Sequence, residues 1–454
     1  MKKTLLSAIA LMVSFTVFAQ IDTLKYRIAF TDKNGSSFSV NRPEEFLSAK
    51  AIERRAKQGL VIDESDLPVN ASYIDAVKSH GVSVVAKGKW ENFLTVSCNE
   101  KEAIERIKEL PFVRSVEMVW FASEKDLNPE EIKRDSLVNE MVHHDNYYGA
   151  AWEQINLCNG NKLHEEGYKG EGMTIAVIDA GYHNMDQITG MNNINVLGIS
   201  DFVNPASDIY AENGHGTSVL SCIAMNKPHY MVGTAPNASF WLLRSEDESS
   251  EHLVEQDYWA AAVEFADSVG VDVVNTSLGY NEFDDISKNY TYSQLDGNHA
   301  LMSRQASRMA DKGMVLVCSA GNSGAGSWKK TTAPGDAKNV LTVGAVNSKG
   351  TLAPFSSIGN TADNRVKPDV VSVGWQSDVM GTNGVVNKAN GTSFSSPILC
   401  GMVACLWQAC PNLTAKELVE LVRKVGDRYD EPDNIYGYGI PDLWSAYQLV
   451  KGDK

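Results

Sequence analysis

The sequence contains no apolar run long enough to span a membrane after its first 20 residues, which favours a protein without a membrane anchor. It also lacks an excess of basic charge, because 41 Lys and Arg stand against 57 Asp and Glu, for a formal net charge of −16. This balance disfavours nucleic acid and anionic membrane surfaces as partners, since both attract clustered Lys and Arg. The 454 residues show no internal repeat, and this length suits one small and one large domain.

Cysteine is scarce and irregularly spaced, with seven residues and no dense disulfide framework. Cys222, Cys318 and Cys400 fall in apolar patterns, so we expect the cysteines to be mostly free and buried. None stands in a glycine-rich setting typical of a nucleophile, which disfavours a cysteine protease. No cluster of His and carboxylate residues has the spacing of a catalytic zinc site.

The N-terminus has the pattern of a cleavable signal peptide. Lys2 and Lys3 precede an apolar run over residues 5–18, and small residues at Val17 and Ala19 predict cleavage after Ala19. No cysteine follows that point, so we expect no lipid anchor there. The pattern predicts a secreted or periplasmic protein.

The segment 390–397 reads Asn-Gly-Thr-Ser-Phe-Ser-Ser-Pro and surrounds Ser393 with small residues. An apolar run over residues 398–407 follows, so we expect Ser393 at the N-terminus of a buried helix. In this interpretation Gly391 lets another backbone approach, and Pro397 lies in the first helical turn. Free N–H groups and the positive end of the helix dipole then surround the serine oxygen. Serine alone is a weak nucleophile, so a base and an orienting acid are required.

Candidates for both lie upstream. Residues 173–178 form the apolar run of a strand buried in a parallel sheet, and Asp179 stands at its carboxyl end, where open α/β sheets place active sites. His215 lies between Gly214 and Gly216 at a predicted helix start, which leaves its ring accessible. The order Asp, His, Ser along the chain is one of the known orders of a catalytic triad.

A fourth segment provides a candidate hydrogen-bond donor for an oxyanion. Residues 314–318 predict another buried strand, and the Gly-rich stretch after it contains Asn322, which is suited to donate a hydrogen bond to an oxyanion. Taken singly, Asp179 and Asn322 could be turn residues, His215 a helix-start residue and Ser393 a small packing residue. The four motifs together, in one order, favour the catalytic interpretation.

These motifs resemble those of the subtilisin-like serine proteases (subtilases), over about residues 147–450. The resemblance implies an α/β fold with a mostly parallel sheet flanked by helices on both faces. It also implies that Asp179 orients, His215 is the general base, Ser393 is the nucleophile and Asn322 serves the oxyanion hole. The family usually has Ser or Thr where this chain has Ala180. A hydroxyl there would only support the carboxylate, so we expect a modest effect.

The resemblance extends to the walls of a substrate cleft. Residues 270–279 predict a strand whose end resembles the segment of the family that pairs with an extended substrate. The substrate-binding residues predicted in this way are Ser277, Leu278, Gly279, Ser319, Ala320 and Gly321. Thr332, near the expected pocket floor, is neutral and argues weakly against a pocket dedicated to Lys or Arg. The side-chain preference stays open.

Residues 20–123 differ in character from the rest of the chain. They predict strands at 26–30, 82–86, 93–97 and 112–119, and helices at 43–57, 74–80 and 102–110. This order resembles the small α+β propeptide of subtilases, which implies a folding helper and temporary inhibitor with its C-terminal tail, starting at residues 116–120, in the cleft. A helper suits a parallel sheet, because non-local strand pairing is slow. A plain accessory domain is the alternative.

The predicted organisation has four parts: a signal peptide (1–19), a propeptide (20–123), a linker with the maturation site (124–146) and a catalytic domain (147–454). No cofactor and no metal site is predicted. Many subtilases bind calcium in the loop after the His-bearing helix, but Lys227 and Pro228 there do not suit a cation that needs oxygen ligands. Calcium sites elsewhere stay open.

The segment after residue 245 is acidic, with Glu246, Asp247, Glu248, Glu251 and Glu255. We expect a solvated loop and helix face, and a preference for basic substrates is the alternative.

The sequence as a whole predicts an exported serine endopeptidase, made as a monomeric zymogen that acts on proteins or peptides and is inhibited by its own propeptide. The alternative from another class is a catalytically silent peptide-binding protein on the same fold. Within the enzyme class, a narrow processing protease and a broad degradative one both remain open.

Overall fold

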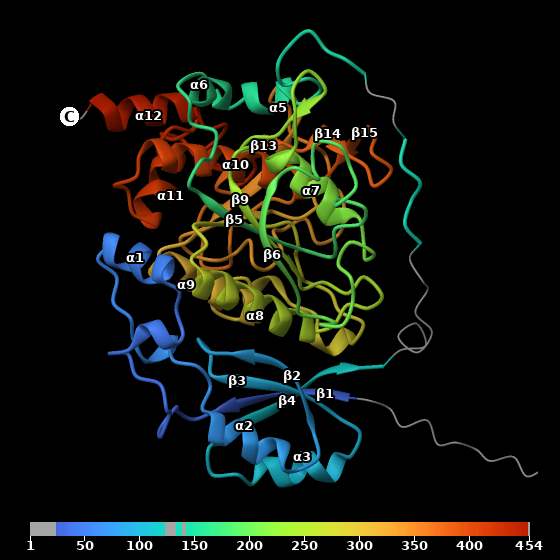
Figure 1. Ribbon diagram of the computed structural model, residues 1–454, viewed down its shortest axis with the longest axis vertical. Helices are drawn as coiled ribbons and strands as arrows, with labels where there is room; N and C mark the ends of the chain where they lie inside the picture. Colours follow the sequence, from blue (N-terminus) through green and yellow to red (C-terminus); the bar gives the residue numbers. More distant parts are fainter. Residues whose placement is uncertain (1–23, 123–132, 139–141, 453–454) are drawn as a thin grey trace, which may run out of the picture.

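A computed structural model describes residues 24–122, 133–138 and 142–452 of the chain. The predicted signal peptide (1–19) and residues 124–132 and 139–141 of the predicted linker lie outside the described residues. Among the helices that are described, none is both long and apolar enough to cross a bilayer. Figure 1 shows a small N-terminal unit packed against a larger second unit.

The N-terminal unit is a four-stranded antiparallel sheet in the order β2-β3-β1-β4, with two helices on its outer face (Figure 1). The strands are β1 (Leu24–Phe30), β2 (Ser83–Gly88), β3 (Phe93–Cys98) and β4 (Val113–Phe121), and the helices are α2 (Ala71–Lys78) and α3 (Lys101–Lys108). Ile28, Leu94 and Ile107 are fully buried between the sheet and the helices. The predicted α+β arrangement is confirmed.

The helix predicted over residues 43–57 is broken into a 3₁₀ turn (Pro43–Glu45) and the helix α1 (Ala49–Lys57). Ser48 caps α1, because its side chain accepts a hydrogen bond from the backbone N–H of Ala51 at 3.2 Å. A serine in the cap position therefore starts a new helix within the predicted one.

The prediction that the inhibitory tail begins at residues 116–120 was wrong. These residues lie inside β4, where Val116 and Met118 pair with Ile28 and Tyr26 of β1. A segment held in a sheet cannot also lie in a cleft, so any tail starts after Phe121.

The second unit is built on a seven-stranded parallel sheet in the order β13-β12-β11-β10-β5-β9-β6. Its strands are β5 (Thr174–Asp179), β6 (Asn195–Asp201), β9 (Ser239–Arg244), β10 (Val273–Thr276), β11 (Val315–Ser319), β12 (Leu341–Val346) and β13 (Val370–Val373). All six residues of β5 are buried, as its apolar sequence predicted.

Helices cover both faces of this sheet, so the predicted fold class is confirmed (Figure 1). Ile175 and Val177 of β5 face one layer, and Ala176 and Ile178 face the other, because successive side chains of a strand point to opposite faces. The first layer holds α5 (Trp152–Asn156), α6 (Gly160–Glu165), α7 (His215–Ala224), α10 (Thr392–Ala409), α11 (Ala415–Lys424) and α12 (Leu443–Gly452), and the second holds α8 (Val254–Val269) and α9 (Leu301–Met309).

Two hairpins complete the second unit: β7 (Asn226–Lys227) with β8 (Met231–Val232), and β14 (Trp375–Met380) with β15 (Val386–Asn390). The first lies in the loop after α7, where the sequence disfavoured a calcium site. Short 3₁₀ turns lie at Glu64–Asp66, Ile286–Lys288, Tyr292–Gln294 and Ala310–Lys312.

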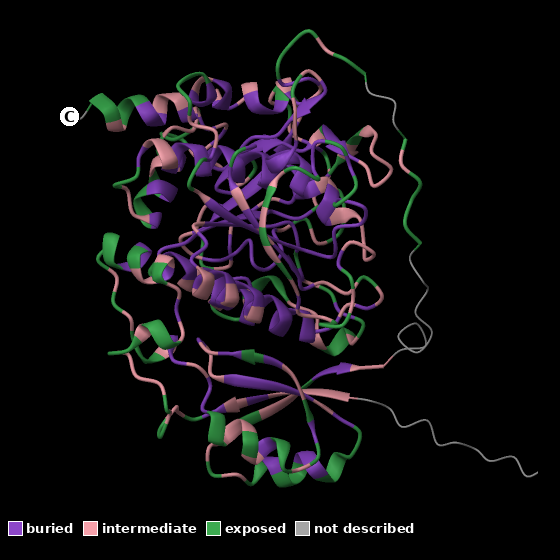
Figure 2. Cartoon of the chain, in the orientation of Figure 1, coloured by how far each residue is buried: buried purple, intermediate pink, exposed green. Residues whose placement is uncertain are grey.

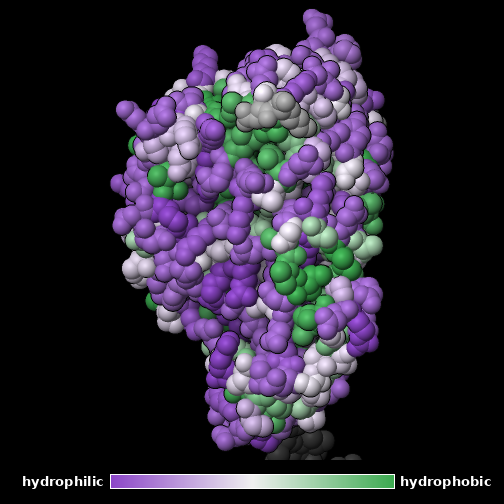
Figure 3. Space-filling model, turned by 90° about the vertical axis from the view of Figure 1, so that its left-hand side faces the viewer, coloured by the Kyte–Doolittle hydropathy of each residue, from purple (hydrophilic) through white to green (hydrophobic). Residues whose placement is uncertain are grey.

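Burial is concentrated in the sheet and central helices of the second unit, as Figure 2 shows. All seven cysteines are buried, and Cys222, Cys318 and Cys400 are free, as expected. Burial raises the pKa of the Cys318 thiol to about 12, so this thiol stays unreactive at neutral pH. The side view in Figure 3 shows a largely hydrophilic surface with separate hydrophobic patches.

The sheet of the N-terminal unit packs against helix α8 (Figure 1). Trp90 and Trp120 share a hydrophobic cluster with Tyr258 and Trp259 of that helix. The predicted helper domain therefore packs mainly on a helix that covers the parallel sheet, and it reaches the sheet itself where Lys50 of α1 donates to the Thr174 hydroxyl at the start of β5 at 2.5 Å.

Candidate active site

Asp179 ends β5 at the carboxyl edge of the sheet and is fully buried, with an exposed fraction of 0%. Its Oδ1 accepts a hydrogen bond from the backbone N–H of Ala180 at 2.9 Å and another from Nδ1 of His215 at 2.7 Å. The carboxylate therefore fixes one nitrogen of the imidazole and leaves Nε2 for other chemistry.

His215 is the first residue of α7, and its backbone N–H donates to Oδ1 of Asn213 at 2.6 Å. A Cβ at Gly216 would lie 2.3 Å from the carbonyl oxygen of Gly181 and 3.0 Å from Cβ of Asp179. Glycine is therefore required at Gly216 so that the helix start can approach the Asp179 loop.

Electrostatics favour the protonated form of His215. Burial alone lowers the pKa of the imidazolium, but the charge of Asp179 and its hydrogen bond raise this pKa, with smaller contributions from Glu248 and Glu246, to about 9. An imidazole with these neighbours binds a proton readily, as a general base must.

Ser393 is the second residue of α10, with an exposed fraction of 9%. Its hydroxyl donates to the carbonyl oxygen of Ser277 at 3.3 Å. Its own backbone N–H is among the first four of the helix, which have no partner within the helix.

Two details of the predicted serine segment were wrong. Pro397 is the sixth residue of α10 rather than part of its first turn. A proline there removes the N–H that would bond the carbonyl of Ser393, and that carbonyl instead accepts from the Ser277 hydroxyl at 2.8 Å. A Cβ at Gly391 would meet no atom closer than 3.6 Å, so no close backbone approach requires glycine there.

Asn322 follows β11 and turns its amide oxygen away from the cleft. Its Oδ1 accepts from the backbone N–H of Thr392 at 2.9 Å and from the Thr392 hydroxyl at 3.0 Å. The amide NH₂ is left available as a donor. Thr392, which the sequence analysis did not single out, therefore positions Asn322, and its only sequence signal is its place before Ser393.

His215, Asn322 and Ser393 line one cavity of about 330 Å³, and the fully buried Asp179 lies outside its lining. Its lining includes Ala180, His215, Glu246, Glu248, Ser277, Leu278, Gly279, Asn281, Ser319, Gly321, Asn322, Ser323, Thr332 and Ser393. Five of the six predicted wall residues belong to this lining. Ala320 does not, because it is fully buried, with an exposed fraction of 0%.

The cavity also contains side chains that the sequence analysis did not assign to it. Glu246, Glu248 and Asn281 contribute to its lining. The amide of Asn213 donates to Glu248, which connects the loop before α7 to the acidic segment after β9. Only the folding of that segment onto the sheet edge reveals this proximity.

Comparisons with known proteins agree with the fold. The model of the subtilase family (peptidase S8) matches residues 170–439, and a peptidase S8 propeptide domain described from Bacteroidota matches residues 25–136. The chain is 29% identical over 301 residues to the serine protease AprX of Bacillus subtilis. This match covers 60% of this chain and 65% of AprX. It is 27% identical over 300 residues to subtilisin DY of Bacillus licheniformis, covering 65% of this chain and 97% of the relative. It is also 27% identical over 377 residues to subtilisin E of Bacillus subtilis, covering 82% and 85%.

Proposed function

The chain belongs to the subtilase family of serine endopeptidases and has the propeptide domain of that family, and we propose that it is an exported zymogen whose triad is Asp179, His215 and Ser393. The observation that carries this proposal is the 2.7 Å hydrogen bond from His215 Nδ1 to buried Asp179, together with the cavity that His215 and Ser393 both line. This pairing holds the imidazole in the tautomer that can accept a proton on Nε2.

The proposed reaction is acyl transfer to water. His215 takes the proton of the Ser393 hydroxyl as its oxygen attacks the scissile carbonyl, and Asp179 stabilises the imidazolium that forms. The Asn322 amide and the Ser393 backbone N–H stabilise the oxyanion of the tetrahedral intermediate. The imidazolium then protonates the leaving amine, and water releases the acyl group from Ser393 by the same steps in reverse.

Substrate binding uses the end of β10. We propose that a peptide lies extended along Ser277, Leu278 and Gly279, opposite Ser319 and Gly321, with its backbone hydrogen-bonded as an added strand. The predicted domain bounds (20–123, 124–146 and 147–454), the inhibitory role of the propeptide, the monomeric state and export to the periplasm or medium belong to the same proposal.

Replacing Asn322 with alanine should lower kcat by about 10²–10³-fold with little change in KM, because the amide acts mainly on the oxyanion. Steady-state kinetics on a fluorogenic peptide measure both constants. Asn298→Ala is the control, since Asn298 is exposed and outside the cavity lining. An unchanged kcat in Asn322→Ala would remove this residue from the mechanism.

The activity should increase with pH through the alkaline range. His215 must be neutral to act as a base, and its pKa is raised to about 9, so the active fraction falls about tenfold per pH unit below that value. The pH profile of kcat/KM reports this pKa for the free enzyme. Glu248→Gln should shift the profile to lower pH, because one nearby negative charge is lost. A midpoint at or below 6.5 would contradict the expected raised pKa.

A catalytically silent peptide-binding protein on this fold is the second candidate. It would retain the cavity and the strand edge but would not react with a serine-directed fluorophosphonate. Labelling of the full chain, before and after limited trypsin treatment, separates a silent protein from a zymogen that another protease activates.

A further inference from the structure

Three carboxylates converge at one edge of the candidate active site. They belong to Glu246, Glu251 and Glu255, and one oxygen of each lies within 4.8 Å of the others. We call these three residues the acidic cluster. The sequence predicted a solvated loop and helix face here, and this was wrong for Glu255, which has an exposed fraction of 1%.

The cluster has no positive partner in the described part of the chain. Both carboxylate oxygens of Glu255 are buried without a hydrogen-bond partner, and no ion pair joins any of the three to a described Lys, Arg or His. The only hydrogen bond to a cluster carboxylate within that part comes from the Tyr280 hydroxyl, which donates to Glu246. Burying a carboxylate without a partner costs free energy, so a cation bound between these groups would stabilise the site.

The titration of the cluster agrees with this. Burial raises the pKa of Glu246 to about 7, with Asp179 and Glu248 adding to the shift and the Tyr280 hydroxyl and His215 opposing it. Burial, together with the charges of Glu246 and Asp284, raises the pKa of Glu251 to about 8. Burial, together with the charges of Glu246, Glu251 and Asp247, raises the pKa of Glu255 well above its ordinary value. A cation between these groups would favour their charged forms and lower all three pKa values.

The position of the cluster connects it to a bound peptide. Glu246 lines the cavity that contains His215 and Ser393, and Tyr280 directly follows Gly279 of the proposed substrate-pairing segment. Glu246 and Glu251 are partly exposed and Glu255 is buried. Of the three, Glu246 alone belongs to the cavity lining, so a ligand side chain that reaches the cluster from the cleft contacts Glu246.

We propose that the acidic cluster is a subsite that binds a Lys or Arg side chain of the peptide substrate. This inference rests on the proposed protease function and names a substrate class for it. Both side chains combine a long apolar stem with a terminal cation, and guanidinium offers enough donors for several carboxylates. Thr332, at the expected pocket floor, is not one of the three cluster residues, although it lines the same cavity as Glu246. We therefore assign the subsite to a different residue of the peptide from the one that contacts Thr332.

The test uses the full chain expressed from Gln20 and allowed to mature. Fluorogenic peptides that are otherwise identical carry either Arg or citrulline, its neutral analogue of equal shape, at one position at a time. At one position the wild type should hydrolyse the Arg peptide with a kcat/KM about 10–100-fold higher, as expected for a hydrogen-bonded charge pair. Glu251→Gln and Glu255→Gln should each bring this ratio toward one.

The control is Glu282→Gln, which removes an exposed carboxylate outside the cluster and should retain the ratio. Equal hydrolysis of the Arg and citrulline peptides at every position would contradict the proposed subsite but would leave the proposed protease function intact. Failure to hydrolyse any peptide would overturn the proposed function and the subsite with it.

A second arm measures thermal unfolding with EDTA and with CaCl₂. If calcium raises the Tm of the wild type but not of Glu255→Gln, and Arg is not preferred, the cluster binds a divalent metal and the proposal is wrong. The proposal expects the Arg preference to persist in EDTA.

Discussion

Replacing Ser393 with alanine should lower kcat for a peptide substrate by about 10⁶-fold and abolish fluorophosphonate labelling, because the hydroxyl that would form the acyl bond is gone. The residual rate would come from the oxyanion donors and from substrate binding alone. The same change should stop self-processing, so the variant expressed from Gln20 stays full length while the wild type shortens to a fragment that begins near residues 120–150. Gels and labelling of the two proteins side by side measure both effects.

Ser395→Ala is the matched control for this experiment. Ser395 lies in the same helix and is fully buried, but its hydroxyl donates to the carbonyl oxygen of Thr392 at 3.0 Å and does not line the cavity. This variant should label and process as the wild type does. Labelling that persists in Ser393→Ala and disappears in Ser395→Ala would show that the wrong serine had been assigned.

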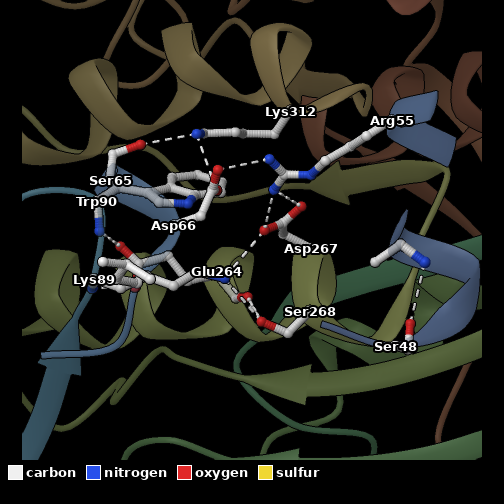
Figure 4. A network of polar contacts seen from close by, with 12 residues as sticks. Ser48, Arg55, Ser65, Asp66, Lys89, Trp90, Glu264, Asp267, Ser268 and Lys312 are labelled. Atoms are coloured by element: carbon white, nitrogen blue, oxygen red, sulfur yellow. Dashed lines mark hydrogen bonds and ion pairs between the residues drawn. The ribbon is translucent and has the colours of Figure 1, made fainter. Parts of the chain in front are cut away.

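The second large effect concerns the contact between the two units, shown in Figure 4. Asp267 of α8 is fully buried and binds three cations of the N-terminal unit: Arg54 at 2.6 Å, Arg55 at 2.8 Å and Lys89 at 3.1 Å. Arg55 also contacts Asp66 at 2.9 Å. The network ties α1 and the turn before β3 to one carboxylate of the second unit.

Asp267→Ala should destabilise the chain by about 3–5 kcal/mol, because it leaves the buried guanidinium of Arg54 without its ion-pair partner and removes one of the two carboxylates that pair with Arg55. Urea unfolding in a Ser393→Ala background measures this loss without interference from self-processing. Glu45→Ala, which removes a half-exposed pair with Arg42, should cost no more than about 1 kcal/mol. Equal stabilities of the Asp267 and Glu45 variants would show that the buried network contributes little.

The pH dependence of the same contact follows from the pKa of Asp267. Burial raises this pKa, but Lys89, Arg54 and Arg55 outweigh it and hold the pKa at about 2, below the ordinary value of 3.8. The stabilisation is therefore fully present above about pH 4 and is lost as the pH falls toward 2. The stability difference between wild type and Asp267→Ala should shrink over that range.

Local patterns in the sequence predicted single strands and helices, and the resemblance of the motifs to the subtilases implied the fold class. The apolar run before Asp179 predicted a buried strand, and the small residues around Ser393 predicted a helix start, because burial and helix capping depend on neighbours in the chain. The family motifs then identified Asp179, His215, Asn322 and Ser393 as candidates, and the folded chain brings all four to one edge of the sheet.

Side chains that act through distant partners could not be predicted in this way. Thr392 orients Asn322 from 70 positions away, and the Ser277 hydroxyl bonds the carbonyl that Pro397 leaves without a partner, 116 positions from Ser277. Neither contact leaves a periodic pattern or a turn motif in the sequence. Each contact depends on how two strands and a helix meet in the folded chain.

The sequence by itself therefore determined the class of fold, the presence of a propeptide-like domain and the chemistry that four short segments can carry. Only the tertiary structure decided which charges lose contact with water. Asp267 becomes the centre of a paired network and Glu255 becomes a buried carboxylate without a partner, although both are acidic residues of the same helix. The physical reason is that the cost of a charge depends on its surroundings in space, and these come from segments far apart along the chain.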